Sequence, residues 1–155
     1  SDMKTVKVFV KTSLQGPCIR DGRYAAVVEY ISSRGAVTRE ISGEEKGTTY
    51  HRSVLLAIIE ALDLLKVECS VTVYTDCIFV KNTAERGSPE NWRRSEWKKV
   101  DGREVKNRDL WQQFTELADR HEIVFRFSKH NDYSHRLTEL LENAAAFSKC
   151  KENRE

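Results

Sequence analysis

The stretch from Val71 to Trp111 constrains the fold most strongly. It begins with a β-branched run, VTVYT, which predicts a buried strand that ends just before Asp76. After a short apolar segment come tryptophans interleaved with basic residues, in NWRRSEWKKVDGREVKNRDLW. Open α/β sheets place their ligand chemistry at the carboxyl ends of their strands. An acid at such an end, beside a basic segment rich in tryptophan, predicts an α/β sheet with a functional site at one edge.

The segments before this stretch predict three strands joined by turns. Alternating apolar residues favour strands over residues 4–11, 24–31 and 36–41. Ser33–Gly35 is typical of a hairpin turn, and the residues from Gly43 to Gly47 are interpreted as a charged loop. Thr48 or Thr49 is expected to cap the helix that follows.

Helices and strands then alternate along the rest of the chain. The pattern predicts a helix over 52–66, a strand over 71–75, a short helix over 78–81, a helix from Asn107 or Asp109 to 120, a strand over 123–127 and a helix over 134–147. This order, β-β-β-α-β-α-β-α, indicates a mixed five-stranded sheet flanked by helices. We expect one α/β domain over residues 3–148 and a charged tail over 149–155. Ser1 and Asp2, ahead of Met3, are interpreted as a cloning remnant.

Composition indicates a soluble globular domain. The chain has 155 residues, of which 39% are hydrophobic and 32% charged. No apolar run approaches the roughly 20 residues of a membrane span. The four cysteines form no CxxC pair, so we expect reduced thiols and a cytoplasmic protein.

Positive charge is concentrated in one segment, residues 92–108, which we call the basic arm. The net charge of the whole chain is only +2. The arm alone holds seven basic residues against three acids, a local excess of +4. Such a segment is typical of contact with a nucleic-acid backbone.

The chain resembles the ribonuclease H family, of the bacterial type with a basic protrusion. The resemblance rests on segments that span nearly the whole chain: FVKTS, GRYAAVVEY, TTYHRSVLLAIIEAL, YTDCIFV, the arm and HRLTELLENAA. It implies the ribonuclease H-like fold and, in active members, hydrolysis of RNA in RNA/DNA hybrids. That reaction uses two Mg²⁺ or Mn²⁺ ions held by four carboxylates.

Only one of the four carboxylate positions keeps an acid. The resemblance places the catalytic carboxylates at Lys11, Val54, Asp76 and Thr138, so Asp76 alone remains. It also places a polar pair that contacts substrate at Tyr50 and His51. We therefore expect no metal cofactor, with Asp76 as the ligand if a metal binds. Because Lys11 and Asp76 should end neighbouring strands, we predict an ion pair between them.

Other carboxylates could in principle replace the missing ligands. The helical period turns Glu60 away from Val54 and Glu139 away from Thr138, which argues against both. Asp21 and Asp132 remain open as alternatives. The family's mobile histidine is matched only weakly, by His130 and His135.

Three functions follow as hypotheses. The first is a ribonuclease H-like protein that has lost two-metal hydrolysis and binds hybrid or other duplex nucleic acid. The second is an active hybrid endoribonuclease with relocated metal ligands, and the third is a protein-interaction module on the same fold. The candidate nucleic-acid contacts are Arg93, Arg94, Lys98, Lys99, Lys106, Trp92, Tyr50 and His51, although packing is the favoured interpretation of Trp92.

Overall fold

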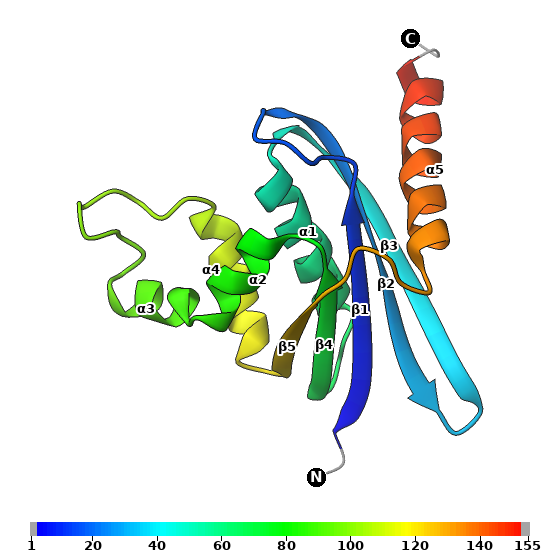
Figure 1. Ribbon diagram of the computed structural model, residues 1–155, viewed down its shortest axis with the longest axis horizontal. Coiled ribbons are helices and arrows are strands. Elements are labelled where there is room, and N and C mark those ends of the chain that lie inside the picture. Colours follow the sequence, from blue (N-terminus) through cyan, green and yellow to red (C-terminus); the bar gives the residue numbers. More distant parts are fainter. Residues whose placement is uncertain (1–2, 153–155) are drawn as a thin grey trace.

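The computed structural model describes the backbone of residues 3–152 and the side chains of residues 3–143 (Figure 1). Its centre is a five-stranded sheet in the order β3-β2-β1-β4-β5. The first three strands are antiparallel neighbours, whereas β1 runs parallel to β4 and β4 to β5. The strands are β1 (Lys4–Thr12), β2 (Arg20–Ser32), β3 (Gly35–Thr48), β4 (Cys69–Thr75) and β5 (Glu122–Phe127). The predicted mixed five-stranded sheet is confirmed.

Helices cover both faces of the sheet. On one face lie α1 (Tyr50–Asp63), α2 (Ile78–Glu85) and α4 (Arg108–Ala118), whereas α5 (Ser134–Glu152) stands on the opposite face (Figure 1). The short helix α3 (Ser88–Arg94) lies in the part of the molecule that projects away from the sheet. Thr49 caps α1, because its hydroxyl accepts a hydrogen bond from the backbone N–H of Arg52 at 3.4 Å.

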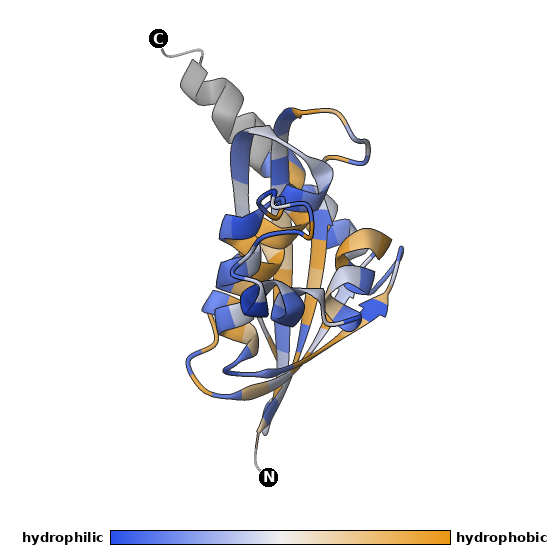
Figure 2. Cartoon of the chain, turned by 90° about the vertical axis from the view of Figure 1, so that its left-hand side faces the viewer, coloured by the Kyte–Doolittle hydropathy of each residue, from blue (hydrophilic) through white to orange (hydrophobic). Residues whose placement is uncertain are grey.

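The main core follows from the alternation of β1. Val6, Val8 and Val10 all face the α1 side, where they pack in one cluster with Leu55 and Ile58 of α1. Figure 2 shows hydrophobic residues gathered along the central strands and on the helix beside them. Residues two apart in a strand share a face, so the opposite side chains of β1 point toward α5.

A second, smaller core lies under α5. Phe9 is stacked on Tyr74 with ring centroids 4.6 Å apart, and Leu137 and Leu141 of α5 pack on the same cluster. Arg136 of α5 also pairs with Glu40 of β3 through two hydrogen bonds of 2.6 and 2.8 Å. These contacts hold α5 on the sheet near the functional site described below.

Several of the predicted boundaries were wrong. The segment from Gly43 to Gly47 is the end of β3 and not a loop, since pairing with β2 continues to Thr48 despite the glycines and charges. Gly43 is required there because the ring of Tyr24 leaves no room for a Cβ. The short helix runs to Glu85 rather than residue 81, and α3 begins beside Pro89 in a segment for which no helix was predicted.

The end of the chain also differs from the prediction. Helix α5 continues to Glu152, so it includes residues 149–152 of the predicted tail. The remaining tail residues, 153–155, and residues 1–2, which the sequence analysis interpreted as a cloning remnant, lie outside the described residues. In the described part of the chain, no helix has both the length and the apolar character needed to cross a membrane.

Candidate functional site

A cavity of about 370 Å³ lies at the carboxyl ends of β1 and β4. This is the sheet edge that the sequence predicted, because β1 and β4 are parallel neighbours. The charged side chains in its wall are two lysines, Lys11 and Lys129, and one carboxylate, Asp76. The complete wall is Lys11, Thr12, Leu14, Gln15, Tyr50, Asp76, Lys129 and His130. The cavity therefore has a cationic excess, which suits an anionic ligand.

Lys11 and Asp76 line the same cavity, but the predicted ion pair between them is not formed. Both side chains are exposed, and no ion pair within 4.0 Å joins them. Asp76 instead accepts a hydrogen bond at 3.3 Å from the hydroxyl of Tyr50, at the start of α1. Exposed ammonium groups stay hydrated and gain little from pairing, so neighbouring strand ends alone did not fix this contact.

The other two positions that the resemblance assigned to carboxylates do not reach the cavity. Val54 is only 2% exposed and belongs to the main core. The hydroxyl of Thr138 donates to the backbone oxygen of Ser134, one helical turn back, at 3.0 Å. Next to Val54, Ser53 is hydrogen-bonded to Thr12 at 2.7 Å. Hydroxyl and methyl groups thus stand where carboxylates would be needed.

Three of the four alternative acids are engaged elsewhere, and the fourth, Asp132, is exposed and does not belong to the cavity wall. Glu60 accepts a hydrogen bond from the hydroxyl of Tyr24. Asp21 accepts one from the backbone N–H of Gly47 at 2.9 Å, and Glu139 lies 3.5 Å from Arg136. Among the described residues, no three His, Cys, Asp or Glu side chains form a group that could hold a metal ion. With one carboxylate and two lysines, the donor set of the cavity does not fit two divalent cations.

An aromatic surface lies beside the cavity; we call Tyr50, His51 and Phe79 the aromatic ledge. The rings of His51 and Phe79 are stacked, with centroids 4.1 Å apart and planes at 3°. The ring of Tyr50 lies 5.6 Å from that of His51. The sequence indicated Tyr50 and His51 but missed Phe79, whose only signal was an apolar residue three positions after Asp76. That Phe79 is 49% exposed could not be read from the sequence.

Burial and a neighbouring cation set the charge of the ledge. Burial, and then the positive charge of Lys106, lower the pKa of His51, so its imidazole is neutral at pH 7. Lys106 belongs to the basic arm, so a cation of the arm contributes to the lowered pKa of His51. Burial also raises the pKa of Tyr50, with further contributions from Cys77 and Asp76, so its hydroxyl stays a donor. Cys77 is 1% exposed, so its thiol is a small buried side chain beside Asp76.

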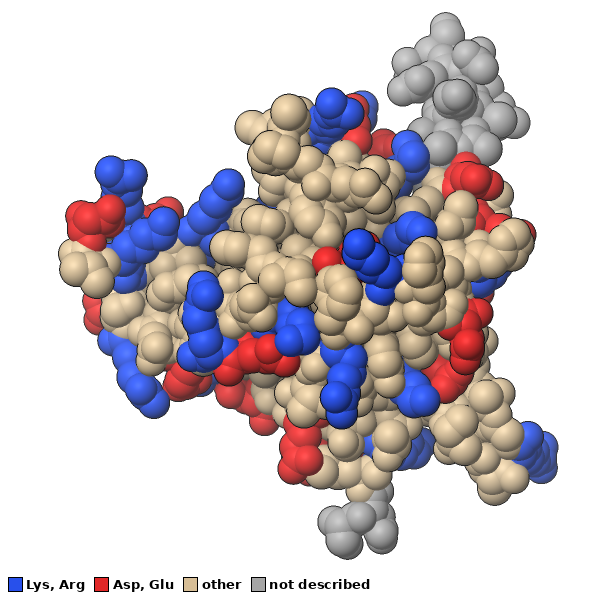
Figure 3. Space-filling model, in the orientation of Figure 1, with Lys and Arg blue, Asp and Glu red and all other residues tan. Residues whose placement is uncertain are grey.

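The cations of the basic arm are not equally available for binding phosphate groups. Arg93 pairs with Asp119 at 3.1 Å, Arg103 with Asp101 at 3.3 Å and Arg108 with Glu104 at 2.6 Å. Figure 3 accordingly shows acidic and basic side chains interleaved over the projecting part of the molecule. In the described part of the chain, no ion pair involves Arg94, Lys98, Lys99 or Lys106, and all four are exposed. Of the predicted arm contacts, these four can meet phosphates without losing an ion pair.

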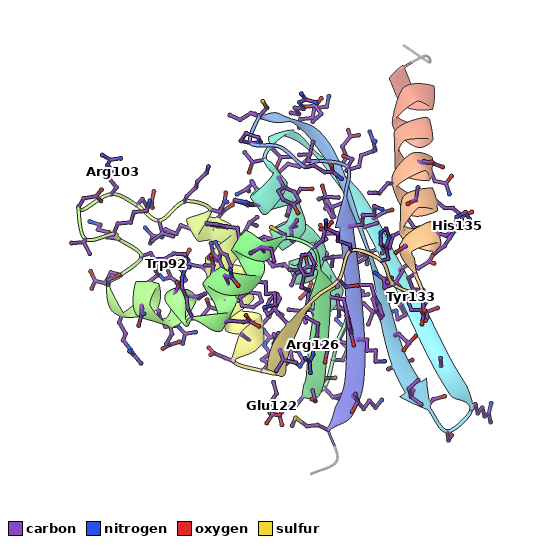
Figure 4. The ribbon with its side chains drawn as sticks, viewed as in Figure 1. Trp92, Arg103, Glu122, Arg126, Tyr133 and His135 are labelled. Carbon is purple, nitrogen blue, oxygen red and sulfur yellow. The ribbon has the colours of Figure 1, made fainter. Side chains whose placement is uncertain are left out.

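Trp92 serves mainly to attach the arm to the body. It is half-buried, and its ring meets Trp111 edge-on at 5.8 Å and Trp97 at 6.4 Å. It lies at the base of the arm, whereas Arg103 lies at the outer end (Figure 4). The backbone N–H of Trp97 also donates to the oxygen of Trp92 at 2.7 Å. These contacts agree with the packing interpretation of Trp92.

Arg52 connects three elements around the site. Its guanidinium donates two hydrogen bonds, of 2.9 and 2.8 Å, to the carboxylate of Asp109 at the start of α4. A third, of 2.9 Å, goes to Glu45 near the end of β3. We call these contacts of Arg52 with Asp109 and Glu45 the bracket. Because α4 directly follows the arm, the bracket fixes the arm relative to α1 and the ledge.

This bracket predicts a pH-dependent contribution to stability. The hydrogen bonds from Arg52 hold the pKa of Asp109 below its usual value. The contribution is therefore complete above the unfolded pKa, about 4, and is lost as the pH falls through the lower folded value. We expect Asp109→Asn to lower the free energy of unfolding by about 1 kcal/mol at pH 7, and the difference from the unsubstituted protein to shrink below about pH 4.

Urea denaturation from pH 2 to pH 7 measures this difference. Glu116→Gln serves as the matched control, because Glu116 is an exposed acid on the same helix outside the bracket. A constant difference between Asp109→Asn and the unsubstituted protein across this range would contradict the assignment.

Comparison with known proteins places this geometry in a family. The family model for RNase H matches residues 3–138. A ribonuclease H from Nitratidesulfovibrio vulgaris is 41% identical over 128 residues, which cover 81% of this chain and 77% of that protein. A ribonuclease H from Chlorobium luteolum is 40% identical over 126 residues, covering 79% of this chain and 84% of the relative.

Two solved structures show the same fold. The crystal structure of LC9-RNase H1, a type 1 RNase H with the type 2 active-site motif, superposes with a TM-score of 0.76 at 23% identity; the match covers 94% of this chain and 74% of that one. LC11-RNase H1, solved in complex with an RNA/DNA hybrid, has a TM-score of 0.66 at 15% identity and covers 92% of this chain and 98% of its own. At these identities the likeness is one of fold.

Proposed function

Because the chain belongs to the ribonuclease H family, we propose that it is a nucleic-acid-binding member that has lost two-metal hydrolysis. The observation that carries this proposal is the wall of the cavity. It holds Asp76 as its only carboxylate, with Lys11 and Lys129 beside it. A fixed ammonium repels a divalent cation, and a partly dehydrated Mg²⁺ needs several negative oxygen ligands.

The same change favours retention of a nucleic-acid ligand. Replacing a carboxylate by Lys11 makes the cavity attractive to a phosphodiester. The four exposed cations of the arm, Arg94, Lys98, Lys99 and Lys106, extend the positive surface away from it. A fold relative was solved with an RNA/DNA hybrid bound, which makes a hybrid the first ligand to test. We expect the contacts to be mainly with phosphates, and therefore strongly dependent on salt.

The test is a binding titration with a fluorescently labelled RNA/DNA hybrid in 50–200 mM salt with EDTA. We expect log Kd to rise linearly with log salt concentration. In Lys98→Ala/Lys99→Ala the slope should fall by about 2 and binding should weaken, because each phosphate contact contributes close to one unit of slope. The labelled strands are recovered afterwards and checked for cleavage.

The matched control is Lys7→Ala/Lys66→Ala, which removes two exposed lysines outside both the arm and the cavity. This control should leave the salt slope unchanged. Equal weakening by both pairs would mean that only net charge matters, and the arm would lose its assigned role. Binding too weak to detect even at 50 mM salt would reject the nucleic-acid function itself.

A further inference from the structure

The geometry points to a site for an unpaired nucleotide of a single-stranded segment, with the base stacked on the aromatic ledge and the backbone phosphates held by Lys11 and Lys129 of the adjoining cavity and by Lys106 of the arm. This inference rests on the proposed nucleic-acid function and names the kind of strand that the site accepts.

The ledge offers a ring face to solvent. Phe79 is 49% exposed, and its neighbour Ile78 is 48% exposed, at the start of α2. Exposed aromatic rings of this kind are the platforms on which nucleobases stack in single-strand binding proteins. His51 lies flat against Phe79 at 4.1 Å, which holds the ring in a fixed orientation. A base that stacks here meets a surface that is already ordered.

The ledge is poorly suited to reading the edges of paired bases. The hydroxyl of Tyr50 is already bonded to Asp76 at 3.3 Å, and the ring of His51 lies against Phe79. In a continuous duplex, both faces of each base are covered by neighbouring bases. Stacking on protein therefore requires an unpaired base, as in a single strand or an overhang.

Cations of the cavity and of the arm act near the ledge. After burial, the positive charge of Lys106 in the arm contributes to the lowered pKa of His51. Tyr50 forms part of both the ledge and the cavity, whose wall contains Lys11 and Lys129. A stacked nucleotide carries one backbone phosphate before its base and one after it. Because the cavity adjoins the ledge at Tyr50, its lysines are suited to one of these phosphates.

Asp76 does not prevent phosphate binding in the cavity. It is the one carboxylate of the wall, and it accepts a hydrogen bond from Tyr50. Two lysines, Lys11 and Lys129, outnumber it in the wall of the cavity. A phosphodiester carries a single negative charge and so fits this balance without a metal ion.

The experiment compares three probes at one salt concentration: a blunt RNA/DNA hybrid, the same hybrid with a six-nucleotide single-stranded overhang, and the single strand alone. We expect the overhang to bind about tenfold more tightly than the blunt hybrid, as stacking of one base on an aromatic side chain allows. Phe79→Ala should remove this preference, whereas Phe79→Trp should keep it. A 2-aminopurine base in the overhang should be quenched on binding, and Phe79→Ala should abolish that quenching.

Phe127→Ala is the matched control, because Phe127 is a similarly exposed phenylalanine, at 45%, on β5. It should leave both the preference and the quenching unchanged. Lys106→Ala should weaken binding of the overhang more than binding of the blunt hybrid. Thermal unfolding followed by circular dichroism confirms that each variant folds.

The outcomes separate this inference from the proposed function. Equal binding of blunt and overhang probes, unaffected by Phe79→Ala, would overturn the single-strand site and leave hybrid binding intact. If Phe79→Ala keeps both the preference for the overhang and the quenching of 2-aminopurine, the base does not stack on the aromatic ledge, and the inference is overturned. Absence of binding to all three probes would reject the nucleic-acid function and the ledge together.

Discussion

Addition of Mg²⁺ or Mn²⁺ to the purified protein is expected to produce no cleavage of an RNA/DNA hybrid above the level measured with EDTA. Of the four positions that the family resemblance assigns to carboxylates, Val54 lies in the core and Thr138 is bonded within α5. Lys11 adds a positive charge beside Asp76, the one remaining acid. Two-metal hydrolysis needs the metal ions to activate water and to stabilise the leaving oxygen, and this donor set does not hold them.

Calorimetric titration of Mg²⁺ and Mn²⁺ into the protein tests the loss of metal binding more directly than a cleavage assay. We expect no binding heat from the unsubstituted protein and weak, single-site binding from Lys11→Asp, because this change gives the cavity two carboxylates on adjacent strands. Lys7→Asp is the matched control: Lys7 lies on the same face of β1 and the substitution changes the net charge equally. It should bind no metal.

Binding of two metal ions by the unsubstituted protein would contradict the loss of the metal site. The ligands would then have to include acids such as Asp132, outside the cavity wall. Cleavage must also be traced to this protein, so Asp76→Asn is assayed beside it. Metal-dependent cleavage that disappears in Asp76→Asn would show that the protein is an active nuclease.

The fold could be predicted because its signals are local and periodic. In β1 the alternation of Val6, Val8 and Val10 fixes which face meets α1, and in α1 the spacing of Leu55, Ile58 and Leu62 fixes the opposing stripe. The prediction for the end of β3 was wrong for the converse reason. Gly43 and Gly47 carry turn signals, but pairing with β2 and the ring of Tyr24 decide the conformation there. Tertiary contacts outweighed local propensity.

The site could be predicted only as far as the backbone determines it. Neighbouring parallel strands brought Lys11 and Asp76 to one cavity, as expected. Which side chain would contact Asp76 depended on α1, whose first residue, Tyr50, reaches it with a hydroxyl. The stacking of His51 on Phe79 likewise joins two helices, and no spacing within one segment encodes it.

The largest loss of stability from a single truncation is expected at Trp111. Its side chain is 2% exposed and lies edge-on to Trp92 at 5.8 Å and to Phe114 at 5.6 Å. Removing a buried tryptophan ring leaves a cavity that the surroundings fill only partly, at a cost of about 3–5 kcal/mol. That is a large share of the total free energy of unfolding of a domain of this size, about 5–15 kcal/mol. Urea denaturation of Trp111→Ala measures the loss directly.

Comparison with Trp92 separates the stability of the body from the placement of the arm. Trp92 is half-buried, so Trp92→Ala should cost less than Trp111→Ala in urea denaturation, yet it removes the contact that attaches the arm. We expect Trp92→Ala to remain folded and to lower the salt slope of hybrid binding, since Lys98 and Lys99 are then held less firmly. Trp111→Phe, which keeps an aromatic ring in the core, should recover part of the lost stability. If Trp111→Ala unfolds with the same midpoint as the unsubstituted protein, the tryptophan cluster does not stabilise the domain, and the arm must be held by the bracket of Arg52 and Asp109 alone.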